Sequence, residues 1–200
     1  MHISEGVLSG TVLISGAALA AVGTGIGLKK LDYDQVAKTG MLAAAFFVAS
    51  LIHIPIGPSN AHLILNGLVG LLLGWAAFPA ILVALTLQGA FFQFGGITTL
   101  GVNTLIMALP AVLCYLIFGR LVTKSSRTAA AAFACGFLSV LLSGLLVGLS
   151  LIFTEENFLE VSGIIIAAHI PVMIIEGVVT AICAAFLRKV RPEMLLGMTD

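Results

Sequence analysis

The chain has 200 residues, of which 60% are hydrophobic and 9% are charged. Soluble domains contain roughly 45–50% apolar and about 25% charged residues, so this composition excludes a soluble protein. Nine Lys and Arg residues balance nine Asp and Glu residues, which leaves no basic surface for nucleic acid. We therefore predict an integral membrane protein that forms a single transmembrane domain over residues 1–200, with the lipid bilayer as its surroundings.

Seven apolar runs are candidates for membrane-spanning helices, which need about 20 residues, with a range of roughly 17–25. The predicted fold is therefore all-α, with about seven transmembrane helices. The second and third runs are short, and the alternative for this pair is a shallow hairpin that re-enters the membrane from the cytoplasm. The seven runs are residues 11–28, 41–55, 60–74, 79–94, 103–119, 129–152 and 162–187.

The basic residues predict the orientation of the chain in the membrane. With seven crossings, all of them lie on one side, and the positive-inside rule makes that side cytoplasmic. We expect the N-terminus outside, the C-terminus in the cytoplasm, and a multi-pass protein of the plasma (inner) membrane of a prokaryote. The basic residues form three clusters after the first, fifth and seventh runs: Lys29, Lys30, Lys38; Arg120, Lys124, Arg127; Arg188, Lys189, Arg191.

Polar side chains inside apolar runs are energetically costly and therefore suggest function. The sequence contains no Ser-His-Asp arrangement, no HExxH motif and no phosphate-binding loop of the Walker type. We therefore predict no enzymatic activity and no cofactor of the chain's own, so active transport would require a partner or an ion gradient. Gln88 and Gln93 are interpreted as packing residues or loop anchors. The candidate functional residues are His53, Ser59, Asn60, His62, Asn66, Asn103, His169 and Glu176.

His2 is the most informative residue because it directly follows Met1. A His at this position is too large for methionine aminopeptidase to remove Met1, so we expect Met1 to keep its free α-amine. This amine, the amide nitrogen of His2 and the imidazole Nδ1 of His2 can chelate one metal ion. Ligation by an amide nitrogen favours planar coordination, which is typical of Ni²⁺ or Cu²⁺. The alternative is a His2 that is merely exposed to solvent.

A planar chelate of this kind needs a fourth ligand, and His62 is the preferred candidate. It lies near the start of the third apolar run, on the same predicted side of the membrane as His2. The rival is His53, at the close of the second run. For either residue, the alternative role is that of a hydrogen-bonded packing residue within the membrane.

Four motifs, in order along the chain, resemble the CbiM/NikM family, the membrane substrate-binding components of energy-coupling-factor cobalt and nickel importers. Residues 1–6 read MHISEG and resemble the family's MHIxEG start. Residues 55–63 read PIGPSNAHL and resemble its P-x-G-x-S-x-x-H-L segment. Residues 95–103 read GGITTLGVN and resemble its GGLTALGAN loop, and residues 168–177 read AHIPVMIIEG and resemble its closing helix.

The resemblance implies a six-helix substrate-binding (S) core with an extra N-terminal helix, whose N-terminus enters the core from outside. It implies square-planar binding of Ni²⁺ or Co²⁺ by the Met1 amine, the His2 amide and imidazole, and His62. It also implies four partners: a transmembrane coupling (T) subunit, two ABC-type ATPase subunits and a small accessory membrane protein. Such import supplies, among other pathways, cobalamin biosynthesis. The chain departs from the usual family pattern at residues 60–61 and 66–67, and this bears on its substrate preference.

The remaining candidates each have two interpretations. The three asparagines and Ser59 could orient the metal-binding segments or join helices by hydrogen bonds. His169 and Glu176 lie on one helix face and could relay protons released on metal binding, although a structural polar contact is the preferred interpretation. The alternative function is a stand-alone divalent metal permease or channel, driven by an ion gradient, with this pair as coupling residues. Between the two metals, the Irving–Williams order favours nickel.

Overall fold

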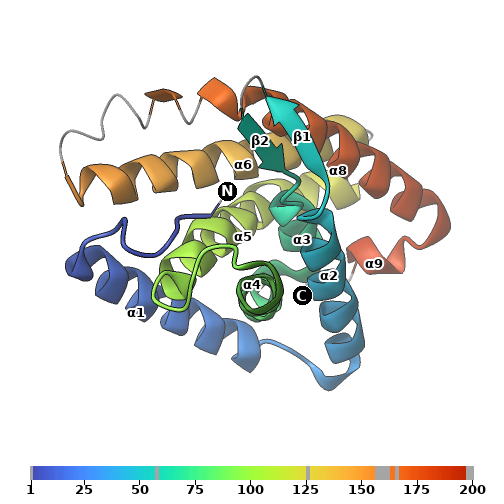
Figure 1. Ribbon diagram of the computed structural model, residues 1–200. Coiled ribbons are helices and arrows are strands. Elements are labelled where there is room, and N and C mark those ends of the chain that lie inside the picture. Colours follow the sequence, from blue (N-terminus) through green and yellow to red (C-terminus); the bar gives the residue numbers. More distant parts are fainter. Residues whose placement is uncertain (1, 57–58, 125–126, 156–162, 165–166, 197–200) are drawn as a thin grey trace.

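The structure is a computed structural model that describes residues 2–56, 59–124, 127–155, 163–164 and 167–196 (Figure 1). Within these ranges, only the backbone is described at positions 53–56, 59–61, 124 and 196. Helices make up nearly all of the described secondary structure. The elements are α1 (Gly10–Lys29), η1 (Tyr33–Gln35), α2 (Val36–Ala49), β1 (His53–Ile56), β2 (Ser59–His62), α3 (Asn66–Leu73), η2 (Gly74–Ala76), α4 (Ala77–Phe92), α5 (Leu100–Lys124), α6 (Thr128–Ile152), α8 (Ile170–Val190) and α9 (Glu193–Leu196).

Five helical stretches in the described part of the chain are long and apolar enough to span a membrane. One of them, Asn66–Phe92, joins α3, η2 and α4. The helical path breaks at Gly74, whose φ of 54° lies in the left-handed region that favours glycine. The other four stretches are α1, Leu100–Thr123, α6 and α8. The all-helical membrane architecture is therefore confirmed, whereas the number of long candidates is smaller than the about seven that the sequence predicts.

The difference lies in the predicted runs 41–55 and 60–74. Residues 53–62 form an antiparallel hairpin instead of helix, with His53 opposite His62. Pro55 has no amide hydrogen and its ring clashes with a preceding helical turn, so a helix cannot continue through this position. The eight residues of α3 give a length of about 12 Å, too short for a bilayer core of about 30 Å. This region is a medium-length helix, a hairpin and a short helix, and not two full-length spans.

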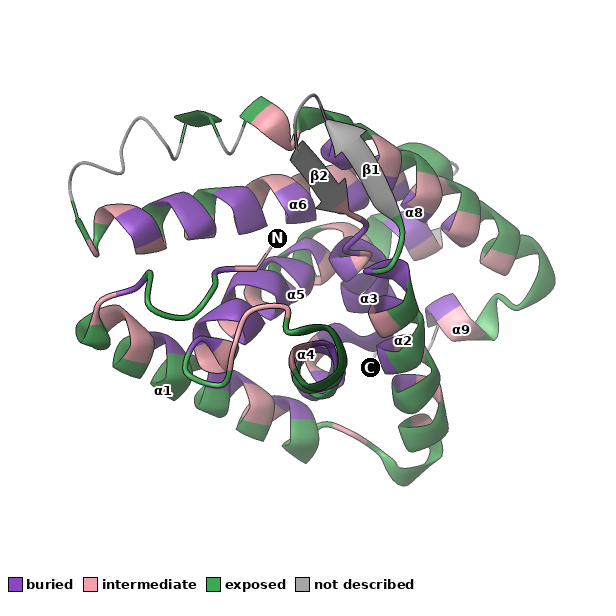
Figure 2. Cartoon of the chain, viewed as in Figure 1, coloured by how far each residue is buried: buried purple, intermediate pink, exposed green. Residues whose placement is uncertain are grey.

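The short helix α3 lies at the centre of the core, and all of its residues are buried (Figure 2). Two glycines allow it to lie directly against its neighbours. A β-carbon at Gly70 would lie 2.2 Å from the carbonyl oxygen of Ala111 on α5, and one at Gly67 would lie 2.7 Å from the Cα of Gly136 on α6. Small residues permit such close helix contacts inside membranes. The packing of α3 therefore fixes the strand end that precedes it.

The long helix α1 lies at the edge of the bundle, and much of its surface is exposed (Figure 2). Ile14, Leu19 and Val22 are between 56% and 74% exposed. Its inner face carries glycines, and Gly16 and Gly23 lie against Val102 and Phe78. An apolar outer face with a small-residue inner face is the pattern of a helix that faces lipid on one side.

The helix termini that carry basic residues meet at one end of the bundle. Lys38, near the start of α2, donates to the carbonyl of Met194 beyond α8 at 3.1 Å. Lys30, just after α1, lies over the ring of Trp75 at 5.5 Å from its centroid. The N-terminal segment, residues 2–9, contacts the α4–α5 connection through Glu5 and Thr98 at the other end. The two ends of the bundle therefore differ in charge.

Candidate metal centre

Asn103 on α5 holds the N-terminal segment inside the bundle, where Figure 1 places the N-terminus between α5, α6 and the hairpin. Its side-chain oxygen accepts the N–H of Ile3 at 2.9 Å, and its amide donates to the Ile3 carbonyl at 3.0 Å. The same amide also donates to Thr99 Oγ1 at 3.2 Å. Both buried backbone groups of Ile3 are thereby paired, as buried backbone groups require. Asn103 therefore fixes the position of the adjacent His2.

The rings of His2 and His62 meet although they come from distant parts of the chain. Nδ1 of His2 lies 3.0 Å from Nε2 of His62, and the two ring centroids are 4.8 Å apart. Phe94, in the α4–α5 connection, lies parallel to His62 within 4° at 6.2 Å and contacts His2 at 5.6 Å. Three elements therefore build one cluster: the N-terminal segment, the end of β2 and the α4–α5 connection.

The outer hydrogen bonds of the two rings determine which nitrogens carry protons. Nδ1 of His62 faces the Leu63 carbonyl at 2.9 Å, and Nε2 of His2 faces the side-chain oxygen of Gln88 at 2.8 Å. Both oxygens can only accept, so these two ring nitrogens donate. The lone pairs on the other two nitrogens, His2 Nδ1 and His62 Nε2, therefore converge on one point where they can share a cation.

The protonation state of His2 also suits a ligand. Burial is the main cause that lowers the pKa of His2 to about 2, and the neighbouring His62 lowers it further. The imidazole of His2 is therefore neutral at physiological pH, which is the form that binds a metal ion.

The nitrogen separation fits neighbouring corners of a planar metal site. With imidazole–metal bonds of about 2.0–2.1 Å, two nitrogens at adjacent corners of a square lie about 2.9 Å apart, and the observed value is 3.0 Å. No group of three or more His, Cys, Asp or Glu side chains in the described part of the chain could hold a metal ion. Further ligands from the protein would have to include backbone nitrogens. Met1, which would supply its α-amine, lies outside the described residues.

Glu176 on α8 holds the segment that follows His62. Its carboxylate accepts the N–H of Ile64 and, through its two oxygens at 2.9 and 3.0 Å, the N–H of Leu65. The unpaired N–H groups and the dipole at the start of α3 stabilise a carboxylate there. Leu65 has a φ of 56°, a strained conformation that persists only where its surroundings enforce it. Glu176 therefore has a structural partner in the backbone next to His62.

Asn66, the first residue of α3, joins three helices. It donates to the Met107 carbonyl at 3.2 Å and to Ser143 Oγ at 2.9 Å, and its own oxygen accepts from Ser139 at 3.0 Å. These contacts tie α3 to α5 and α6. The sequence allows two roles for Asn66: orienting a metal-binding segment or joining helices. The described contacts are hydrogen bonds between helices, and they lie close to the His62 segment.

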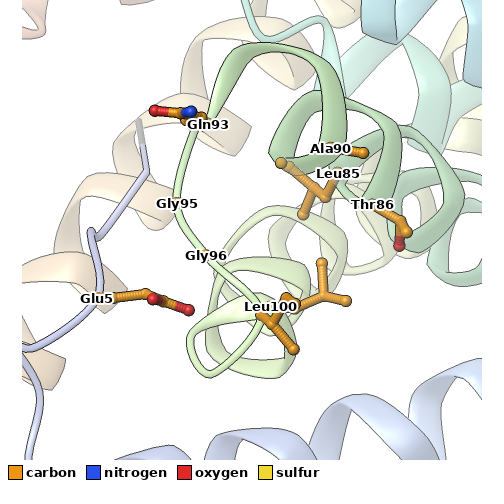
Figure 3. A pocket seen from close by; sticks show the side chains of 10 residues that line it. Glu5, Leu85, Thr86, Ala90, Gln93, Gly95, Gly96 and Leu100 are labelled. Carbon is orange, nitrogen blue, oxygen red and sulfur yellow. The ribbon is translucent and has the colours of Figure 1, made fainter.

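A cavity of about 550 Å³ lies on the Glu5 side of the N-terminal segment (Figure 3). Glu5, Gln93 and Gly96 are among the described residues that line it, whereas His2 and His62 are not. The Glu5 carboxylate accepts the N–H of Thr98 at 3.2 Å. A β-carbon at Gly96 would lie 2.0 Å from Glu5 Cγ, so this glycine lets the segment approach. Glu5 therefore anchors the segment to the α4–α5 connection at a second point, apart from the two rings.

Comparison with known proteins decides the family. The profile of the CbiM family, described as the cobalt uptake substrate-specific transmembrane region, matches residues 2–194. A Haemophilus influenzae protein named as a metal transport protein is 40% identical over 199 residues, which cover 98% of this chain and 97% of that protein. The chain belongs to the CbiM family.

Other comparisons agree with CbiM membership. An Archaeoglobus fulgidus protein named as a fused nickel transport protein, NikMN, is 30% identical over 201 residues, covering 98% of this chain and 68% of that protein. A crystal structure described as a transition metal transporter superposes with a TM-score of 0.81 at 27% identity, covering 95% of this chain and 93% of that chain. This CbiM-family chain is accordingly a multi-pass protein of the plasma membrane.

The remaining predicted site residues of this CbiM chain are placed only in part. The backbone of His53 pairs with that of His62 across the hairpin, but the side chains of His53, Ser59 and Asn60 lie outside the described residues. His169 directly precedes α8 and is partly buried. The structure therefore brings His2, His62, Asn103 and the Glu176 carboxylate into one region.

Two residues of the site do not follow from the motifs of the CbiM family quoted above. Gln88 hydrogen-bonds His2, so its interpretation as a packing residue or loop anchor is incomplete. Phe94 lies against both rings. The available signal for Gln88 is a side-chain amide within the apolar run 79–94, which it shares with Gln93, because such a group is costly without a partner. An aromatic residue in an apolar chain carries no comparable signal.

Proposed function

We propose that this CbiM-family protein is the substrate-binding membrane component of an ATP-driven energy-coupling-factor transporter that imports Ni²⁺ or Co²⁺. The observation that carries the proposal is the 3.0 Å approach of His2 Nδ1 to His62 Nε2 with both lone pairs converging. The family description names cobalt uptake, and the NikMN relative is named for nickel transport. Both names support a divalent transition metal as the transported substrate.

The proposed ligands are four nitrogens: the Met1 α-amine, the His2 amide, His2 Nδ1 and His62 Nε2. In a chelate through consecutive rings, His2 Nδ1 and His62 occupy adjacent corners, and the nitrogen separation described above supports this order. An amide nitrogen must lose its proton to bind, which favours metals with planar nitrogen coordination. We expect Ni²⁺ to bind more tightly than Co²⁺, because it also stands higher in the Irving–Williams order. The proposal requires Met1 to be retained in the cell, which intact-mass measurement tests.

We place the basic end of the bundle in the cytoplasm and the His2 end outside, in agreement with the positive-inside rule. In this orientation the metal is captured from outside, in one transmembrane unit. A cysteine probe introduced at Lys124 should react only from the cytoplasmic side of intact cells. Labelling of that position from outside alone would reverse the proposed orientation.

The proposed partners are a coupling subunit, two ABC-type ATPases and a small accessory membrane protein. The fused architecture that the NikMN name describes supports a membrane partner for this part of the family. Without a phosphate-binding loop of the Walker type in its sequence, the chain depends on other subunits for ATP hydrolysis.

Two measurements test the function. Protein purified without added metal should bind one Ni²⁺ per chain in calorimetry, with Co²⁺ as a weaker competitor. Uptake of radioactive nickel by cells should require the coupling and ATPase subunits together with this chain. Uptake by the chain alone that stops when ion gradients are dissipated would instead establish a gradient-driven permease.

A further inference from the structure

We infer that Gln88 is a positioning residue that selects the tautomer of His2 able to present Nδ1 to the metal. The inference rests on the proposed metal site. Gln88 belongs to α4, which supplies none of the proposed ligands, and its side chain is fully buried. Its oxygen lies 2.8 Å from His2 Nε2, on the side of the ring that faces away from His62.

The chemical reason lies in the single proton of a neutral imidazole. When Gln88 accepts from Nε2–H, the proton is held on Nε2 and Nδ1 keeps its lone pair. The other tautomer would place the proton on Nδ1, where it would point at His62 Nε2 and occupy the position of the metal. The acceptor at Gln88 therefore determines whether the two ring nitrogens can bind one metal ion together.

His62 needs no such partner from a distant helix. Its Nδ1 donates to the carbonyl of the next residue, Leu63, at 2.9 Å, so the chain itself leaves Nε2 unprotonated. His2 has no equivalent neighbour, because its Nε2 is directed toward α4. Metal-binding histidines usually donate their second ring N–H to an oxygen that fixes tautomer and orientation. Gln88 supplies that oxygen for His2.

The surroundings of Gln88 indicate that its oxygen has a specific role. The amide nitrogen of Gln88 is buried and has no hydrogen-bond partner among the described residues. Burying an unpaired amide N–H₂ is unfavourable, and two converging lone pairs also repel each other. A metal ion bound between the rings removes the repulsion between the two lone pairs. The metal-free arrangement of the two rings is therefore preorganised for a metal ion.

Two substitutions separate an acceptor from a space-filling role. Gln88→Met keeps the length of the side chain but removes the acceptor, so the Kd for Ni²⁺ should rise by about 10–100-fold, the usual effect of losing such a partner. Gln88→Glu keeps an acceptor, so its Kd should lie closer to that of the unchanged protein than to that of Gln88→Met. The matched control is Gln93→Met, because Gln93 follows the same helix but lines the cavity near Glu5.

Calorimetry with Ni²⁺ on full-length protein gives the affinities, and the proton NMR signal of His2 Nε2–H gives the tautomer directly. The signal is recorded in the metal-free protein, because a metal on Nδ1 would hold the proton on Nε2 in every variant. It should be protected from exchange in the unchanged protein and in Gln88→Glu, and lost in Gln88→Met. Unchanged affinity in Gln88→Met, or equal loss in Gln88→Glu, would overturn the inference while the metal site stands. Failure of the unchanged protein to bind Ni²⁺ would overturn the proposed function and the inference together.

Discussion

The two segments that meet at the candidate metal centre are held in different ways. Residues 2–9 have no helix or strand and are held by side-chain hydrogen bonds, with Asn103 on the Ile3 backbone, Gln88 on the His2 ring and Glu5 on Thr98. The segment from His62 to Asn66 lies between a strand and the buried helix α3 and is held by the Glu176 carboxylate. One half of the site thus depends on where a chain end is placed, and the other half on core packing.

This difference teaches how the site can be altered. A change at the chain end can remove ligands and leave the bundle folded, because few core residues are involved. A change near α3 alters both the ligand position and helix packing, because every residue of α3 is buried. Substitutions in the N-terminal segment should therefore lower metal affinity alone, whereas substitutions near α3 should lower both metal affinity and stability.

The largest effect is expected from extending the chain at its N-terminus. An added tag turns the Met1 amine into an ordinary amide and moves the new amine away, so Ni²⁺ binding should be abolished. The thermal unfolding temperature should change little. A C-terminal tag is the control and should leave the affinity unchanged. Calorimetry on the three forms is the measurement, and tight binding by the N-terminally tagged form would eliminate the terminal amine as a ligand.

The next largest effect is expected from His62→Ala, which removes one of four proposed ligands. The loss in affinity should exceed the 10–100-fold that is typical of losing a partner beyond the ligands. His53→Ala is the matched control, because His53 lies opposite His62 in the same hairpin, and its effect should be small. The reverse ranking in a calorimetric comparison would make His53 the ligand.

The pH dependence of Ni²⁺ binding tests the protonation state of the proposed ligands at Met1 and His2. The proposed chelate forms only when the amide and the amine have lost their protons, so binding near pH 7 should release about two protons. His2 should add none, because its pKa is lowered to about 2. The Kd for Ni²⁺ should therefore rise by about 100-fold as pH falls by one unit.

The pKa of His2 also predicts how the docking of residues 2–9 in the bundle depends on pH. An undocked His2 binds a proton below its ordinary value of 6.5, whereas the docked residue, with its pKa near 2, does not. Docking is therefore fully present above pH 6.5 and weakens as pH falls below it.

Calorimetry in buffers of different ionisation enthalpy counts the protons that are released when Ni²⁺ binds. A release of three or more would show that an imidazole of the site is protonated before the metal binds.

The smallest effect is expected from Glu176→Gln in the second half of the site. The amide keeps the shape but loses the charge at the start of α3, so His62 should be held less firmly and the affinity should fall by about 10-fold. The thermal unfolding temperature should also fall, unlike that of the N-terminal variants. Thr180→Val, one turn further along α8 and equally buried, is the control for packing. Equal affinities in the two variants would remove Glu176 from the support of the site.

The sequence predicts one part of this architecture and misses another for physical reasons. Long apolar runs and basic clusters predict a helical membrane protein, because lipid imposes length and charge rules on each segment separately. The hairpin at residues 53–62 escapes this reasoning, because it lies between apolar stretches that by themselves fit helices, and its pairing depends on backbone contacts across a turn. Gln88 and Glu176 act on backbone or ring atoms that are distant in sequence, and no local pattern encodes such partners. His2 and His62, by contrast, follow from ligand chemistry and from the family motifs.

X-ray absorption at the nickel edge of the loaded, untagged protein tests the central claim most directly. The proposed site predicts a four-coordinate planar ion with only nitrogen ligands, two of them imidazoles, because an amine, an amide and two histidine rings surround the metal. The same measurement on His62→Ala should show one imidazole fewer. A six-coordinate ion with oxygen ligands, or a shell with a single imidazole in the unchanged protein, would contradict the joint site of His2 and His62.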